Sequence, residues 1–194
     1  MSVRLGLILA GGNARRFDGR DKGELILDGQ RLFDHVQSRL KPQVDEIWLS
    51  GHHDYGSGLK VISDLEDGPK GPLAGIYSAY IQVKQNEKYE GILTVPIDGP
   101  AFPKDLYCKL SQGGKSCVAH DGRHLHPTFA YWLVSDLKDF FDTKDFAGKL
   151  ALKTLADHVN ASLVKFYDEG VFQNINSKQD LFEARSDRQG NEFK

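Results

Sequence analysis

The sequence predicts a three-layer α/β/α fold with a mainly parallel, Rossmann-like sheet. Short apolar segments alternate with amphipathic helical segments through residues 3–95. This alternation is typical of right-handed βαβ units, whose strands run parallel in one sheet. After Pro103 the pattern loosens, and there we expect one antiparallel strand region in the C-terminal half. The chain has 194 residues, a length that fits one domain.

In the first half, the spacing of apolar residues predicts four strands and two helices. The helix after residue 71 is the best defined, because its apolar residues recur at helical spacing and Pro72 stands where a helix tolerates proline. Its tyrosines, Tyr77 and Tyr80, share that apolar face and are expected in the core. The predicted strands are Val3–Leu9, Glu46–Leu49, Lys60–Ile62 and Gly91–Val95, and the predicted helices are Arg31–Leu40 and Leu73–Lys84.

The second half is expected to contain further helices and strands, and a polar tail over residues 186–194. Ser177 is of a residue type that caps helix N-termini. The predicted helices are Pro103–Leu110, Ser135–Asp142, Lys149–His158 and Lys178–Ala184, and the predicted strands are Ser116–Ala119, Thr128–Leu133 and Leu163–Phe166.

The composition narrows the class of protein and its compartment. The net charge of -2 gives no basic field for nucleic acid or an anionic membrane. No apolar stretch reaches transmembrane length, and no signal-peptide pattern precedes the first strand. The two cysteines are too few for a disulfide framework. We therefore expect a cytoplasmic protein that binds neither nucleic acid nor membrane.

A glycine turn with a cluster of cations follows the first predicted strand. Gly11 and Gly12 permit positive φ and close approach of a ligand to the backbone. Exposed amides of such a loop form an anion-binding concavity, and four cations follow, namely Arg15, Arg16, Arg20 and Lys22. The loop is neither a Walker A loop nor a GxGxxG fingerprint. A tight turn with a solvated basic loop is the alternative, but the preceding strand favours a triphosphate site.

Two aspartates and one glycine extend this prediction. Asp98 follows the fourth predicted strand and can hold Mg²⁺, or can cap a turn before Pro100. Asp64 follows the third strand and can accept hydrogen bonds from a base or ribose, or be an ordinary loop residue. Gly75, inside a predicted helix, indicates close approach of a ligand or of backbone, and helix–sheet packing is the alternative.

Together these motifs resemble those of the molybdenum cofactor guanylyltransferases. The family pattern LAGGxxxRMGxxDK is similar to Leu9–Lys22, and GPLAG matches Gly71–Gly75. The pattern PxDxP matches Pro96–Pro100, HPT matches His126–Thr128, and NxN matches Asn174–Asn176. The order and spacing hold through most of the chain, which makes the resemblance more specific than any single motif.

The resemblance implies an enzyme that transfers GMP from GTP to molybdopterin with Mg²⁺ and releases pyrophosphate. The implied nucleotide-binding residues are Leu9, Ala10, Gly11, Gly12, Lys22, Ser50, Asp64, Gly75 and Asp98. Ser50 falls where the family often has a base-contacting Asn. Lys22, Arg16 and Asp98 would act as electrostatic stabilisers, with Asp98 holding the metal, and Asn174, Asn176 and His126 would lie towards molybdopterin. Proteins that deliver the cofactor or accept the product are further expected partners.

On this interpretation residues 1–194 form one nucleotidyltransferase domain. Residues 1–100 or so would be the nucleotide-binding half, and about 101–185 the acceptor-binding half. Two alternatives stay open: a related nucleotidyltransferase that uses CTP or a sugar-phosphate acceptor, and a nucleotide-binding regulator without catalysis. Lys22 and Asp98 argue against the regulator, and the LAGG and GPLAG segments favour guanine.

Overall fold

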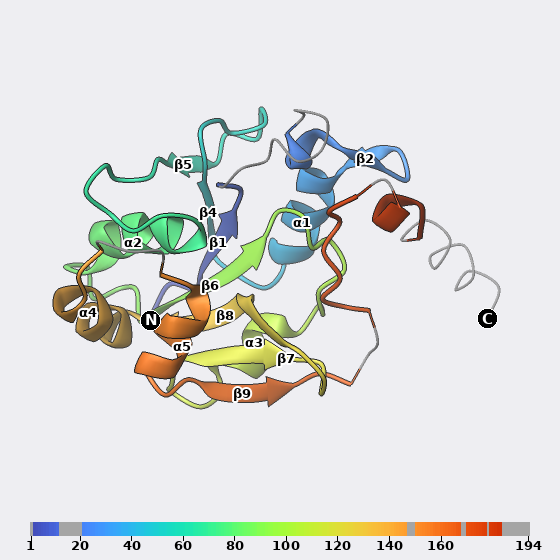
Figure 1. Cartoon of the computed structure of the whole chain (residues 1–194). Coiled ribbons are helices and arrows are strands. Elements are labelled where there is room, and N and C mark those ends of the chain that lie inside the picture. The colour runs from blue at the N-terminus through green and yellow to red at the C-terminus, as the bar shows by residue number, and fades with distance from the viewer. Residues whose placement is uncertain (1, 12–20, 147–149, 168–169, 178, 184–194) are drawn as a thin grey trace.

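One seven-stranded sheet runs through the molecule (Figure 1). The computed structural model describes residues 2–11, 21–146, 150–167, 170–177 and 179–183. The strand order is β5-β4-β1-β6-β8-β7-β9. The strands are β1 (Leu5–Leu9), β4 (Glu46–Ser50), β5 (Lys60–Ile62), β6 (Gly91–Pro96), β7 (Cys117–His120), β8 (Leu125–Leu133) and β9 (Ser162–Lys165).

The strand directions confirm the predicted fold class. Strands β5, β4, β1 and β6 are parallel to one another. Strand β8 runs antiparallel to both β6 and β7, and β9 is parallel to β7. The sheet is therefore mainly parallel with one antiparallel region in the C-terminal half, as the sequence predicts.

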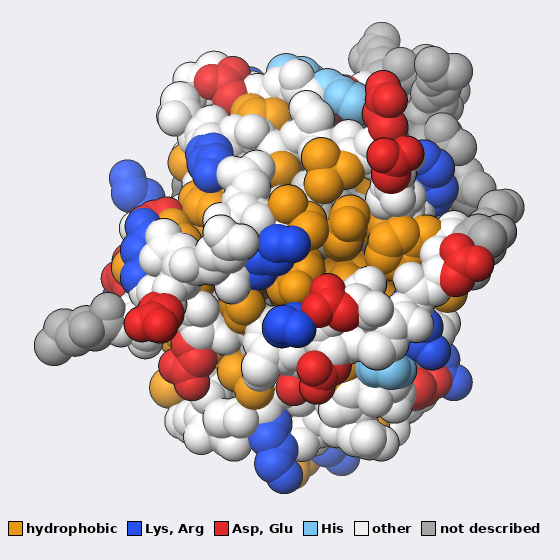
Figure 2. All heavy atoms as spheres, turned by 90° about the vertical axis from the view of Figure 1, so that its left-hand side faces the viewer, with side chains coloured by type: hydrophobic (Ala, Val, Ile, Leu, Met, Phe, Trp, Pro, Cys, Tyr) orange, Lys and Arg blue, Asp and Glu red, His pale blue; other side chains and the backbone are white. Residues whose placement is uncertain are grey.

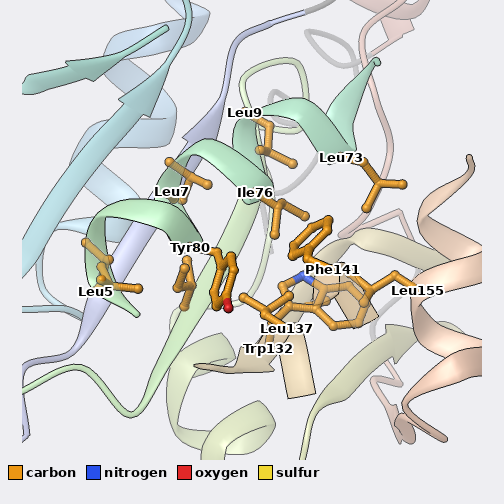
Figure 3. Close-up of a cluster of buried hydrophobic side chains, with 14 of the residues drawn as sticks. Leu5, Leu7, Leu9, Leu73, Ile76, Tyr80, Trp132, Leu137, Phe141 and Leu155 are labelled. Atoms are coloured by element: carbon orange, nitrogen blue, oxygen red, sulfur yellow. The ribbon is translucent and has the colours of Figure 1, made fainter. Parts of the chain in front are cut away.

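Helices cover both faces of the sheet, so a hydrophobic cluster packs on each face. The helices are α1 (Leu32–Leu40), α2 (Pro72–Val83), α3 (Leu106–Ser111), α4 (Val134–Thr143) and α5 (Leu152–His158). Side chains of α2, α4 and α5 pack on one face with Leu5, Leu7 and Leu9, as Figure 3 shows. Side chains of α1 and α3 pack on the other face with Ile8. This alternation along β1 is the period of two that a buried strand requires.

The face with α2 and α4 carries a broad hydrophobic area. Figure 2 shows hydrophobic side chains gathered at the centre of this side of the molecule, with charged side chains around them. Beneath this area lies the hydrophobic cluster of α2, α4 and α5. Tyr80 is buried in it, and Tyr77, Ile81 and Phe146 are partly buried and pack against it. The prediction that Tyr80 belongs to the core is confirmed, whereas Tyr77 is half-buried and packs against that core.

A small hairpin, which the prediction missed, follows the glycine loop. Strands β2 (Ile26–Leu27) and β3 (Gln30–Arg31) pair antiparallel, after a short 3-10 helix η2 (Lys22–Glu24). Asp28 and Gly29 have φ of 49° and 79°, the positive values that a two-residue hairpin turn needs. The Asp-Gly pair is the sequence signal that could have revealed this hairpin.

The C-terminal segment returns to this hairpin. Ile175 is buried against Leu25, Leu27 and Leu32. Residues 179–183 are helical, and Ser177 Oγ accepts a hydrogen bond from Asp180 N at 3.1 Å while Asp180 Oδ2 accepts one from Ser177 N at 3.0 Å. This reciprocal pair is a capping box, so the predicted N-cap at Ser177 is confirmed.

Most other element boundaries fall close to the prediction. Helix α3 begins at Leu106 rather than Pro103, because residues 103–106 form a turn in which Leu106 N donates to Pro103 O. Strand β8 is longer than predicted and begins at Leu125. Within the described ranges, no helix is long and apolar enough to span a membrane. The predicted tail, residues 186–194, lies outside the described residues.

Candidate active site

A pocket of about 240 Å³ opens at the carboxyl ends of β1 and β6. The two strands are neighbours in the sheet, and Ile97 N donates to Leu9 O at 3.1 Å just beyond them. In open α/β sheets this edge is where ligands bind. The pocket is lined by Leu9, Ala10, Gly11, Asp21, Lys22, Pro72, Pro96, Ile97, Asp98, Thr128 and Asn174.

Lys22 and Asp98, which the sequence predicts to share one cleft, are in direct contact. Lys22 Nζ donates to Asp98 Oδ2 at 2.6 Å and to Asn176 Oδ1 at 2.6 Å. The Lys22 and Asp98 side chains are 16% and 14% exposed, so the ion pair is mostly enclosed but still reachable from the pocket. The structure thus brings together three of the predicted site residues from distant parts of the chain.

The position of Lys22 is set by the 3-10 helix in which it lies. Asp21 Oδ1 accepts a hydrogen bond from Gly23 N at 2.7 Å and another from the hydroxyl of Tyr55 at 2.8 Å. A Cβ atom on Gly23 would lie 2.6 Å from both Ile97 Cδ1 and Tyr55 Cε1, so a larger residue there would force these side chains to shift. Sequence reasoning missed all three supporting residues. Asp21 and Gly23 flank the lysine of the glycine loop and could have been suspected, whereas nothing in the sequence marks Tyr55.

Another group of predicted residues gathers where β1, β4 and β5 end. The Cβ position of Gly11 lies 3.6 Å from Ser50 Oγ and 3.9 Å from Asp64 Oδ2. Ser50 is buried, whereas Asp64 remains open to solvent. Although the residue is exposed, the surrounding protein partly desolvates its carboxyl group, which raises the pKa of Asp64. Gly11 also lines the pocket, so this group adjoins the Lys22–Asp98 pair.

Gly75 packs against the sheet. A Cβ atom on this residue would lie 2.1 Å from Ser50 Oγ and 3.4 Å from Leu9 Cδ2. At Gly75 the structure therefore shows helix–sheet packing, the alternative that the sequence left open, and the neighbour is a β4 side chain. Its predicted contact with the nucleotide stays a prediction.

The C-terminal half contributes Asn174 and Thr128 to the pocket. Asn174 Oδ1 is buried, and it has no hydrogen-bond partner among the described residues. Ile175 N donates to Asp98 O at 2.7 Å. This hydrogen bond holds the Asn174–Asn176 segment beside Asp98, the candidate metal ligand. A buried, unpaired amide oxygen in a pocket is suited to accept a hydrogen bond from a ligand.

His126 lies in a different environment from Asn174. Its Nε2 is 3.0 Å from Asp121 Oδ2, and its ring lies tilted against that of Phe172, with centroids 4.8 Å apart. Backbone N–H groups of residues 123 and 124 hold the pKa of the Asp121 carboxyl well below its usual range. His126 does not line the pocket described above, and its predicted contact with the acceptor stays a prediction. Gly12 and Arg16, two further predicted site residues, lie outside the described residues.

A mainly parallel sheet, with Gly11 and an ion pair at its strand ends, is the arrangement of the nucleotide-binding α/β class of proteins. The chain belongs to the MobA-like NTP transferase domain family, whose sequence profile it matches over residues 6–161. It is 37% identical over 183 residues to molybdenum cofactor guanylyltransferases of Yersinia pseudotuberculosis and of Yersinia pestis, covering 90% of this chain and 91% of each relative. The predicted family and the prediction of a nucleotidyltransferase are confirmed.

Solved structures share the fold at lower identity. A molybdopterin-guanine dinucleotide biosynthesis protein A from Archaeoglobus fulgidus superimposes with a TM-score of 0.73 at 20% identity, over 96% of this chain and 99% of that chain. A 2-C-methyl-D-erythritol 4-phosphate cytidylyltransferase from Thermus thermophilus gives a TM-score of 0.66 at 13% identity, over 97% and 100%. Since transferases with different substrates share this architecture, the fold alone does not select the nucleotide.

Proposed function

We propose that this chain transfers GMP from GTP to molybdopterin, giving molybdopterin guanine dinucleotide and pyrophosphate with the help of Mg²⁺. The observation that carries the proposal is the contact between Lys22 and Asp98 in a pocket at the strand ends. The resemblance to molybdenum cofactor guanylyltransferases over 90% of the chain supports the choice of substrates.

The residues around the pocket fit a divalent cation that is shared with a nucleotide. Asp98 and Asp21 both line the pocket, and Mg²⁺ in proteins uses one or two carboxylates together with water and phosphate oxygens. Among the described residues, no group of three or more His, Cys, Asp or Glu could hold a metal by itself. Asp98 would hold the ion, whose chemistry is to neutralise charge on the phosphate oxygens and on the leaving pyrophosphate.

The protein's own contribution is positioning and charge stabilisation. The attacking group would be the terminal phosphate of molybdopterin, which is already anionic near neutral pH, so no protein base is needed. Lys22 would stabilise the negative charge of the triphosphate as a point charge. Arg16 would add a second cation. Since Lys22 already faces Asp98 and Asn176, it lies between the proposed metal site and the proposed acceptor side.

The nucleoside would lie towards Gly11, Ser50 and Asp64. Asp64 has the chemistry to accept hydrogen bonds from a base or ribose, because an ionised carboxylate is an acceptor only. Leu9, Ala10 and Gly11 would offer backbone groups at the end of β1. The acceptor would lie towards Asn174 and Asn176, and the unpaired oxygen of Asn174 supports this assignment.

Pyrophosphate release is the test of the reaction. The full chain is incubated with Mg²⁺, molybdopterin and one nucleotide at a time: GTP, CTP, ATP or UTP. We expect release with GTP and molybdopterin together, and none when either is omitted. Release that is fastest with CTP would contradict the guanine assignment. Binding of GTP without release, in a sample with a native circular dichroism spectrum, would support a regulator instead.

A thermal shift series provides an independent measure of the base preference. A ligand that binds the folded state raises Tm in proportion to the logarithm of its concentration over its dissociation constant. We expect the largest rise with GTP and Mg²⁺. We also propose that residues 1–194 act as one nucleotidyltransferase domain in the cytoplasm, with delivery and acceptor proteins as further partners.

A further inference from the structure

Tyr55 lies outside every motif of the sequence, yet its side chain contacts the turn that carries Lys22. It lies in the loop between β4 and β5. Its hydroxyl donates to Asp21 Oδ1 at 2.8 Å, and the same oxygen accepts a hydrogen bond from Gly23 N at 2.7 Å. One carboxylate oxygen therefore joins the Tyr55 loop to the backbone on both sides of Lys22.

The ring of Tyr55 is also packed against this turn. A Cβ atom on Gly23 would lie 2.6 Å from Tyr55 Cε1, so the ring and the Gly23 backbone are in close contact. The ring stacks on Phe33 with centroids 4.6 Å apart, and Arg31 Nη1 donates to Tyr55 O at 3.0 Å. Burial and the bond to Asp21 raise the pKa of the Tyr55 phenol, so it stays a donor at neutral pH.

The backbone of Tyr55 is held in an unusual conformation. Its φ is 54°, in the left-handed region that a bulky residue seldom adopts. Asp54 stabilises the loop, since its carboxylate oxygens accept hydrogen bonds from Gly56 N and Gly58 N at 3.0 Å each. Such strained residues persist where their surroundings determine them, and they concentrate at functional sites.

We propose that Tyr55 is a positioning residue for nucleotide binding. Through Asp21 and Gly23 it fixes the turn from which Lys22 reaches Asp98 and the triphosphate. The proposal rests on the proposed function, because it assumes that Lys22 contacts the phosphates of GTP. Tyr55 itself need not touch the substrate.

The substitution Tyr55→Phe removes the hydroxyl and keeps the ring on Gly23. We expect KM for GTP, and the dissociation constant of GTP with Mg²⁺, to rise roughly tenfold, which is within the effect of losing one hydrogen bond to a charged group. Tyr89→Phe is the matched control. The Tyr89 hydroxyl also donates to a carboxylate, Glu46 Oε2, at 2.8 Å, and Tyr89 does not line the pocket. This variant should keep the wild-type KM.

A double-mutant cycle separates positioning from a general structural effect. In a Lys22→Met background, Tyr55→Phe should change the GTP dissociation constant by less than about twofold, because its effect passes through Lys22. An unchanged KM in Tyr55→Phe would overturn the positioning role of Tyr55 but leave the proposed function standing. An equal loss of GTP affinity with and without Lys22 would do the same. A wild-type chain that neither binds nor turns over GTP would instead defeat the proposed function, and the present inference with it.

Discussion

Replacing Gly75 with alanine tests the packing of α2 on the sheet. The added Cβ atom would lie 2.1 Å from Ser50 Oγ and 2.6 Å from Ser50 Cβ, distances that real Cβ atoms essentially never show. Ser50 is 2% exposed on β4, between neighbours on both sides, and Leu9 closes the third side at 3.4 Å. The helix must therefore move away from the sheet, or Ser50 must shift towards Gly11.

Two opposing effects set the size of the change in stability on replacing Gly75 with alanine. Overpacking a well-filled core costs about 1–3 kcal/mol. Alanine in place of glycine inside a helix gains up to about 1 kcal/mol from backbone entropy and hydration. Because the contacts with Ser50 are severe, the overpacking cost should lie in the upper part of its range, at about 2–3 kcal/mol. Less a gain of about 1 kcal/mol, we expect Gly75→Ala to lower the free energy of unfolding by about 1–2 kcal/mol, which for a chain of this size lowers Tm by roughly 2–8 °C.

Urea unfolding followed by circular dichroism measures this difference. Gly113→Ala is the matched control, because a Cβ atom there would meet nothing within 4 Å and the residue's φ is not in the left-handed region. The double variant Gly75→Ala/Ser50→Gly makes room for the new methyl group, and we expect it to be more stable than the sum of the two single changes by about 1 kcal/mol or more. A Gly75→Ala chain as stable as wild type, or more stable, would refute the packing argument.

Three further predictions concern the site and one surface ion pair. Asp98→Ala should lower the rate of pyrophosphate release at least about hundredfold, as loss of one charge-stabilising group does, while the circular dichroism spectrum stays native; full activity would mean that the metal is held elsewhere. Asp64→Asn should weaken GTP binding and should remove the weakening of GTP binding at low pH. In the wild type, binding should weaken as pH falls through the raised pKa of Asp64, at a higher pH than for an ordinary aspartate, and equal pH profiles of the two chains would count against a nucleoside contact. Arg4 holds the pKa of Asp45 at about 2, below its usual 3.8. The ion pair therefore stabilises the folded state at pH values above the usual pKa, and this stabilisation is lost as the pH falls through the pKa of the folded state. Asp45→Asn should therefore be less stable than wild type at neutral pH in urea titrations, with the difference vanishing near pH 2, and a difference that persists there would contradict the assignment.

Much of the fold could be predicted from local patterns. The buried strands before Ala10 and Pro96 and the helix after Gly71 appear in the structure close to the predicted bounds. Apolar periodicity specifies them because each element must turn one or both faces to the core. The hairpin at residues 26–31 was missed, although the Asp-Gly pair at its turn was visible in the sequence.

Two glycines show what could not be predicted from the local sequence. The sequence left open whether a ligand, backbone or the packed sheet lies against Gly75, and the structure shows the sheet, through Ser50 on β4. It gave no indication that Gly23 has space only for a hydrogen atom beside Ile97 and Tyr55. Both constraints arise from the distance between two packed layers, and no pattern within one segment encodes that distance.

The sequence by itself determined the class of fold, the position of Gly11 after β1 and that of the carboxylate after β6, because strand ends and helix starts are encoded within a few neighbouring residues. Only the tertiary structure decided that Lys22 meets Asp98 and Asn176, which are 76 and 154 positions away. It alone placed Tyr55 behind the turn that carries this lysine. Such contacts depend on strand order and on how loops return to the sheet edge, and these follow from the packing of the whole chain.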